Sequence, residues 1–286
     1  MVKNEYKRLL LSWITVIFLA AQTALTVVNY YFSLLQKAEY VSIYNGGSQA
    51  DLNMEALQEL ISSYNGFRFF FDYYNGSDES NIGIILAFAW LGIFITASAC
   101  RHRESGYGCY FVTRCGYKSY CKSLLAAQSL YIATCWGILF ILQLISAFIV
   151  GRENGAGYRI YNAPQCLGII FCLCLIYAFY FICINAIVSG FIFFVRGKYI
   201  IQAAPLLIFV ILPILVIGIL PSIIGNFADL IPLLINPFSY LTELTYLIRV
   251  FYFSDLVNLF ISMCCYLLCA AALTGISMKK LNRNYI

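Results

Sequence analysis

The sequence predicts an all-α integral membrane protein, and three observations lead to this fold class. Hydrophobic residues make up 62% of the 286 residues and charged residues only 11%, against about 25% charged in an average soluble domain. The apolar residues gather in runs of about twenty or more, the length that a helix needs to cross a bilayer. Basic residues are spread unevenly between these runs, which favours one topology. We therefore expect a single transmembrane domain over residues 1–286.

Six apolar runs meet the length requirement for a bilayer-spanning helix. The first run is too long for a secretory signal and lacks a clear cleavage site, so we interpret it as a retained helix. An even number of spans places both termini on the same side of the membrane. The predicted spans are 9–35, 82–100, 124–150, 166–195, 200–224 and 256–278.

The distribution of basic residues predicts which side the termini face. Of the eighteen lysines and arginines, thirteen lie near the two termini or in the segments 101–123 and 196–199. Of the thirteen acidic residues, only Glu5 and Glu104 lie on that side. Because cytoplasmic loops carry an excess of Lys and Arg, both termini and the segment 101–123 are predicted to be cytoplasmic.

Two outside segments have features of their own. Within the polar segment 36–81, the stretch 51–64 has apolar residues at helical spacing and Asp51 as a possible N-cap, which predicts an amphipathic helix on the outer leaflet. The stretch 228–253 is apolar but interrupted by charges and prolines, so two short helices that dip into the outer leaflet fit it better than a seventh span. The interrupting residues of this predicted re-entrant hairpin include Pro232, Asn236, Pro237, Glu243 and Arg249.

The sequence lacks residues that several kinds of catalytic or binding site require. The only histidine, His102, stands between two arginines, so His-based metal clusters and triads are not expected. No GxxxxGK[ST] phosphate loop occurs, so the chain is not expected to hydrolyse ATP itself. The twelve cysteines avoid the two long outside segments, which argues against a disulfide framework. The predicted spans contain no Asp, Glu, Lys, Arg or His, which disfavours an ion-coupled carrier.

The basic segment 101–123 has two possible interpretations. It holds five Lys or Arg, one acid, and aromatic residues that suit a short helix at a membrane surface. A charge run is usually a solvated face, so this segment could simply be a cytoplasmic anchor loop. The other interpretation is a docking element for a soluble partner.

A short motif in this segment favours docking. An arginine and an acid are followed by a glycine, a second arginine and a lysine at the start of the third span. Together with the six spans, the cytoplasmic termini and the broken hairpin before the last span, this order resembles the permease subunits of type-2 ABC exporters. Tyr107 departs from the family pattern, in which threonine is frequent at this place. The matching residues are Arg103, Glu104, Gly106, Arg114 and Lys122.

The resemblance implies a function and partners. In that family the segment between spans two and three is a coupling helix that docks in a groove of a separate ATPase subunit, and the re-entrant hairpin helps to close the external end of the pathway. The chain would be the permease subunit of an ATP-driven exporter in the cell membrane, of bacterial cytoplasmic type, paired with a second copy or a related permease. ATP and Mg²⁺ would be bound by the partner ATPase, and no cofactor by this chain. The implied docking residues are Arg103, Glu104, Gly106, Tyr107, Tyr110, Phe111, Arg114, Lys118 and Lys122.

The cargo and two other function classes stay open. An aromatic, uncharged interior suits a hydrophobic or amphipathic cargo, and chains of this size in the family often export antimicrobial peptides, although the rings could simply pack the helices. An ion-coupled secondary carrier would show an internal repeat, and none is convincing here. A non-transporting scaffold or sensor would use the same basic segment to hold a cytoplasmic partner. Membrane lipid is the expected surrounding, and no nucleic-acid partner is expected.

Overall fold

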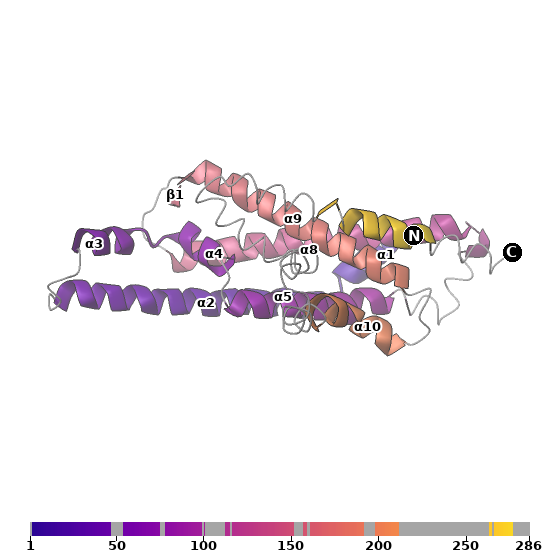
Figure 1. Cartoon of the computed structure of the whole chain (residues 1–286), viewed down its shortest axis with the longest axis horizontal. Coiled ribbons are helices and arrows are strands. Elements are labelled where there is room, and N and C mark those ends of the chain that lie inside the picture. The colour runs from indigo at the N-terminus through magenta and orange to yellow at the C-terminus, as the bar shows by residue number, and fades with distance from the viewer. Residues whose placement is uncertain are drawn as a thin grey trace, which may run out of the picture.

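The structure is a computed structural model, and the part that it describes is almost entirely helical. The long helices lie along one common axis (Figure 1). Three of them are long and apolar enough to cross a membrane, which is compatible with a membrane-embedded protein. The described residues are 2–46, 54–74, 78–98, 100, 112–114, 116–151, 157–158, 161–191, 198–211, 263–264 and 266–276.

The chain begins with two helices where one was predicted. Helix α1 (Val2–Leu10) is amphipathic, with Glu5 and Leu9 buried. It ends before Ser12, whose hydroxyl accepts the Ile14 amide at 3.3 Å and so caps the next helix. Helix α2 (Trp13–Gly46) then runs for 34 residues. The predicted first span, 9–35, thus contains a break at its start, and its helix continues well beyond residue 35.

Two short helices follow in the segment predicted to lie outside. Helix α3 (Met54–Ser62) coincides with the predicted amphipathic stretch. Helix α4 (Gly66–Tyr74) was not predicted, and seven of its nine residues are buried. It packs mainly against α8 and also against α2 and α5. The segment 36–81 is therefore not only polar surface, because part of it enters the bundle.

The second predicted span corresponds to an α-helix that continues as a π-helix. Helix α5 (Asp78–Trp90) passes into η1 (Leu91–Thr96). Residue Gly116, in the left-handed region with φ of 75°, precedes α8 (Tyr117–Val150). This conformation is one that glycine adopts at little cost.

The second half of the described chain contains one small hairpin and three helical segments. Strands β1 (Gly157–Tyr158) and β2 (Tyr161–Asn162) pair antiparallel, with Gly157 opposite Asn162. Helix α9 (Ala163–Phe191) follows, then α10 (Lys198–Leu206) continues as the π-helix η2 (Leu207–Ile211). A last described helix, Tyr266–Ile276, contacts α9 through the rings of Tyr180 and Tyr266.

Side-chain pairs give the relative directions of the first four long helices. Along α2 and α8 the contacts advance together, from Thr15 with Tyr131 to Thr26 with Gln143. Along α5 and α2 they run oppositely, because Gly83 contacts Gln22 and Glu79 contacts Asn29. Helices α8 and α9 are likewise antiparallel, with Gln128 bonded to Asn185 and Trp136 against Phe181 and Tyr177. This alternation is what successive membrane spans require. The total of six spans and their sidedness stay predictions.

Polar side chains lie inside this bundle and many large apolar ones lie outside. Gln22, Gln128 and Gln143 are almost fully buried, whereas Trp13, Ile149 and Phe171 are 81%, 70% and 64% exposed. Among helices in lipid, interhelical hydrogen bonds are an expected attraction, and an apolar exterior carries no penalty. Aromatic rings fill much of the remaining core, including the stacked pair of Tyr74 and Phe140.

Candidate functional site

Three basic residues of the predicted docking segment lie in the first turns of α8 or just before them. Arg114 precedes Gly116, and Lys118 and Lys122 follow it in the helix; all three are exposed. Tyr120 and Cys121 lie on the same turns but are buried. The start of α8 is therefore amphipathic, with one side packed and a basic side exposed.

The basic start of α8 projects beyond the start of α2. The Tyr131 hydroxyl lies 2.5 Å from the Thr15 hydroxyl in the first turn of α2, which fixes the relative level of the two helices. Helix α8 begins at Tyr117, fourteen residues earlier. At about 1.5 Å per residue, its first turns extend about 21 Å past this level. A helical extension thus presents the basic residues away from the start of α2.

A buried ionic contact joins α1 to Ser98, near the end of the second predicted span, 82–100. The Glu5 carboxylate accepts Arg8 Nε at 3.0 Å and Arg8 Nη2 at 2.5 Å. The Ser98 hydroxyl donates to Glu5 Oε1 at 2.5 Å and accepts from Arg8 Nη2 at 2.5 Å. Glu5 is 5% exposed and Ser98 is fully buried. We call these three residues the α1 latch, since they connect α1 to the end of the second apolar stretch.

Replacing Ser98 with alanine is expected to weaken the α1 latch. The change leaves the buried Glu5 carboxylate with one hydrogen-bond donor fewer, and such a loss costs about 1–3 kcal/mol of stability. Thermal unfolding of the purified protein in lipid nanodiscs would measure the cost. Ser42→Ala is the matched control, because the Ser42 hydroxyl is exposed and bonds only the nearby Glu39 carbonyl. Equal unfolding temperatures for both variants would contradict the latch.

A second polar cluster ties α4 to the long helices. Gln143 Nε2 donates to the Thr26 hydroxyl at 2.8 Å, and the Gln143 side-chain oxygen accepts the Tyr74 hydroxyl. The Tyr30 hydroxyl donates to the Gln143 backbone carbonyl at 3.3 Å. One glutamine on α8 therefore connects α2 and α4. Polar side chains that join helices in this way are a common feature of membrane-protein bundles.

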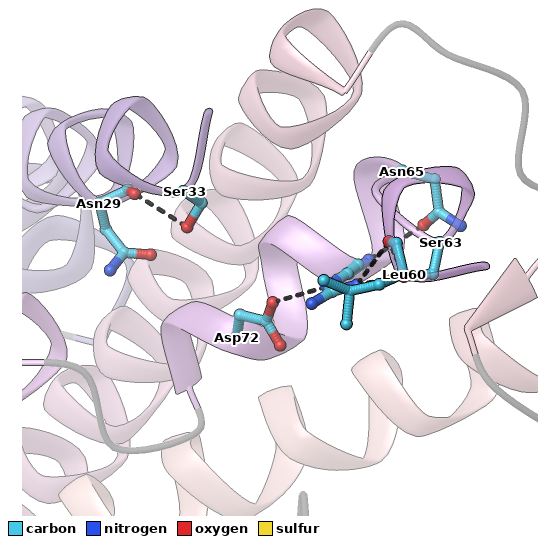
Figure 2. Close-up of polar contacts among 7 residues, drawn as sticks. Asn29, Ser33, Leu60, Ser63, Asn65 and Asp72 are labelled. Carbon is cyan, nitrogen blue, oxygen red and sulfur yellow. Dashed lines mark hydrogen bonds and ion pairs between the residues drawn. The ribbon is translucent and has the colours of Figure 1, made fainter. Parts of the chain in front are cut away.

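An arginine on α4 organises the connection between α3 and α4 (Figure 2). Arg68 Nε donates to Asp72 Oδ2 at 3.2 Å, and its guanidinium also bonds the Ser63 hydroxyl and the Leu60 carbonyl. The guanidinium lies 3.9 Å from the centre of the Tyr64 ring. Burial raises the pKa of the Tyr64 phenol, and Arg68 partly offsets this effect. These contacts compensate the charges that a packed aromatic helix would otherwise carry unpaired.

Most of the predicted site residues fall outside the described part of the chain. In the docking segment the structure places only Arg114, Lys118 and Lys122. The predicted re-entrant hairpin 228–253, with Pro232, Asn236, Pro237, Glu243 and Arg249, also lies outside the described residues. The other docking residues also lie outside the described part of the chain: Arg103, Glu104, Gly106, Tyr107, Tyr110 and Phe111.

The α1 latch and helix α4 were not predicted from the sequence. Glu5 and Arg8 stand three residues apart, a spacing that puts them on one helical face and could have indicated a pair; nothing in the sequence pointed to Ser98. In α4, Arg68 and Asp72 are four residues apart and similarly paired. Comparison of the chain with protein-family models, curated proteins and solved structures finds no match.

Proposed function

We propose that this chain is the permease subunit of a type-2 ABC exporter, driven by a separate ATPase subunit. The observation that supports this most is the helical projection of α8, with Lys118 and Lys122 exposed on it and Arg114 exposed just before it. A loop that serves only as a topological anchor needs no ordered extension beyond the neighbouring helix. An ordered, amphipathic extension is what a rigid contact with a soluble partner needs.

The docking surface would be completed by residues 101–111, which connect the second predicted span to this projection. In the proposal, Arg103, Glu104 and Arg114 make charged contacts with the ATPase, while Tyr107, Tyr110 and Phe111 fill its groove. Gly106 would allow a turn between Glu104 and the aromatic residues. ATP binding would close the ATPase pair and displace the docking segments, which shifts two permease chains between closed and open states. ATP and Mg²⁺ would stay in the partner.

The proposed cargo is a hydrophobic or amphipathic molecule, with a peptide as the first candidate. The bundle interior supports this through its aromatic side chains, such as Trp136 against Tyr177 and Phe181. The predicted hairpin at 228–253 would close the outer end of the pathway. The expected setting is a bacterial cytoplasmic membrane, with both termini on the ATPase side.

The test is a mild-detergent pull-down from the native membrane, with and without the double change Glu104→Ala and Arg114→Ala. An ATPase should co-purify with the unchanged protein in a stoichiometric amount. The unchanged protein should also stimulate ATP hydrolysis by this ATPase. The double variant should insert into the membrane normally. Its stimulation of ATP hydrolysis should fall at least about tenfold, because two charge-assisted contacts are removed. The control is Lys37→Ala with Glu39→Ala, which removes the same charges from the far part of α2. Full stimulation by the double variant would refute the docking assignment.

One observation favours the alternative of an ion-coupled carrier. Helix α5 begins at Asp78, earlier than the predicted span 82–100, so Glu79 belongs to it and contacts Asn29 of α2. Asn29 lies about 24 Å along α2, counted from Trp13 at about 1.5 Å per residue. A half-buried carboxylate therefore contacts α2, although the predicted spans contained none. Transport that continues without any ATPase, in vesicles with an ion gradient, would favour this alternative.

A further inference from the structure

Helix α1 leaves one row of side chains exposed that the docking proposal does not use. Lys3 and Lys7 stand one helical turn apart and are both exposed. The Leu11 amide donates to the Lys7 carbonyl at 3.0 Å, so the turn continues and places Leu11 next in the same row. Leu11 is 81% exposed. We call Lys3, Lys7 and Leu11 the α1 row.

The positive charge of the α1 row is not balanced by the helix itself. The acid of α1, Glu5, is buried on the opposite face and bonded to Arg8 and Ser98 in the α1 latch. Among the described residues, no ion pair includes Lys3 or Lys7. Like charges one turn apart on a helix repel each other. An anion beside both lysines would relieve this repulsion.

The α1 row changes from basic to apolar where the first long apolar helix begins. Trp13 is the first residue of α2 and of the first helix that is long and apolar enough to span a membrane. Trp13 is 81% exposed, and Ile17, one turn further along α2, is 64% exposed. Tryptophan is typical of the membrane interface, and lysines near it extend towards the headgroups. The exposed side chains thus follow the order in which a leaflet passes from phosphate groups to acyl chains.

This order favours a lipid over a soluble protein as the occupant of the α1 row. A soluble partner that covered Leu11 and Trp13 would have to enter the level of the acyl chains. An anionic phospholipid meets both ends of the row, because its phosphate group is negative and its chains are apolar. Lysines close to an anionic leaflet are attracted to it.

The α1 row is also held in place by the rest of the fold. Leu9 is 1% exposed in the core, and the Tyr6 hydroxyl lies 3.2 Å from the Thr134 hydroxyl of α8. The α1 latch fixes the same helix to Ser98. A surface that is already ordered loses little conformational freedom when a ligand binds.

We propose that the α1 row and Trp13 form a binding surface for an anionic phospholipid in the leaflet where α2 begins. Lys3 and Lys7 contact the phosphate oxygens, and Leu11 and Trp13 contact the acyl chains. The surface is separate from the docking segment 101–123. It therefore does not depend on the ATPase or on the exporter proposal.

The three tryptophans of the chain make this surface measurable. Trp90 and Trp136 are 5% and 4% exposed, so Trp13 is the tryptophan that lipid reaches. The full chain is reconstituted in phosphatidylcholine vesicles with a minor share of phosphatidylglycerol, and one of the two lipids carries bromine on its acyl chains. Bromine quenches tryptophan fluorescence at short range. Brominated phosphatidylglycerol should quench as strongly as an at least about fivefold larger share of brominated phosphatidylcholine, the effect expected of one lysine near an anionic lipid.

Paired variants separate the α1 row from the rest of the basic end. Lys3→Gln with Lys7→Gln should abolish the enrichment, whereas Lys3→Arg with Lys7→Arg keeps both charges and should retain it. Lys118→Gln with Lys122→Gln is the matched control, because it removes two exposed lysines from α8 and should leave the enrichment unchanged. Trp13→Phe should remove the lipid-dependent quenching. Each variant is checked for an unchanged unfolding temperature.

Two results would overturn the lipid surface. Equal quenching by the two brominated lipids at equal share would show that the unchanged protein does not select an anionic headgroup. An equal loss of enrichment in the Lys118 and Lys122 control would assign the effect to diffuse attraction by the whole basic end. If the glutamine variant at Lys3 and Lys7 unfolds, salt decides, because NaCl screens exposed charges and should lower the enrichment in the unchanged protein. The vesicles contain no ATPase, so failure of the lipid surface is distinguishable from failure of the exporter proposal.

Discussion

Changing Gly92 to alanine is expected to destabilise the protein more than the same change at Gly66, Gly83 or Gly151. A Cβ at Gly92 would lie 2.1 Å from the backbone oxygen of Gln202 and 3.3 Å from the Pro205 ring. A backbone oxygen cannot rotate away, so η1 and α10 must move apart. Overpacking of this kind costs about 3 kcal/mol.

The matched control for Gly92 is Gly137→Ala on α8. A Cβ at Gly137 would have no neighbour within 4 Å, and alanine is better than glycine in a helix interior by roughly 0.5–1 kcal/mol. The control should therefore unfold at the same temperature as the unchanged protein or above it. Thermal unfolding followed by size-exclusion chromatography would show the difference. A Gly92→Ala protein as stable as the control would mean that η1 and α10 are not in close contact.

Changing Phe70 to alanine is expected to loosen α4 from the bundle. Phe70 is fully buried and its ring lies 5.1 Å from the Tyr74 ring and 5.7 Å from the Phe140 ring of α8. Removing a buried phenylalanine side chain costs about 3–5 kcal/mol, since packing contacts are lost and a cavity is left. Unfolding temperature and limited proteolysis of the 63–77 region would report the loss.

Phe171→Ala on α9 is the control for Phe70, because it removes the same atoms from a ring that is 64% exposed. In a bilayer this ring would face lipid, so little packing is lost. The Phe70 variant should become sensitive to protease near α4, and the Phe171 variant should not. Identical protease patterns would show that α4 is held by its polar contacts with Gln143 and not by its rings.

The long helices α8 and α9 were largely predictable from the sequence. Their apolar runs exceed twenty residues, and the predicted ranges 124–150 and 166–195 overlap most of each helix. The start of α8 was predicted too late, because residues 117–123 contain two lysines. Those lysines are exposed while Tyr120 and Cys121 are buried, so the helix continues as an amphipathic segment. Hydropathy marks the apolar part of a helix and not its ends.

Helix α4 could not be predicted by the same reasoning. Its charged residues Arg68 and Asp72 made the stretch read as polar, although each charge compensates the other in the structure. Its length of nine residues is too short for a span. The π-helix η1 also leaves no periodic signal, since one widened turn shifts the apolar pattern by a single residue. Tertiary contacts, and not the local sequence pattern, determine where α4 and η1 form.

The candidate site was predictable only in part. The sequence singled out Arg114, Lys118 and Lys122, and the structure shows them exposed at the start of α8. The α1 latch needed tertiary information, because Ser98 and Glu5 are far apart in sequence. The contact of Glu79 with Asn29 was not predicted, because the predicted span began at residue 82 and the helix begins at Asp78.

The projecting start of α8 has a mechanical consequence. The helix is continuous from Tyr117 to Val150, with no proline or glycine before Gly137 to serve as a joint. A sideways push on its first turn therefore acts as a force on a lever, with its fulcrum where Tyr131 meets Thr15. The arm from this fulcrum to Tyr117 spans fourteen residues and the arm to Gln143 spans twelve, so a displacement at the first turn would be transmitted to Gln143 at nearly the same size. The contacts of Gln143 lie on the other arm, so they would move in the opposite direction to the first turn.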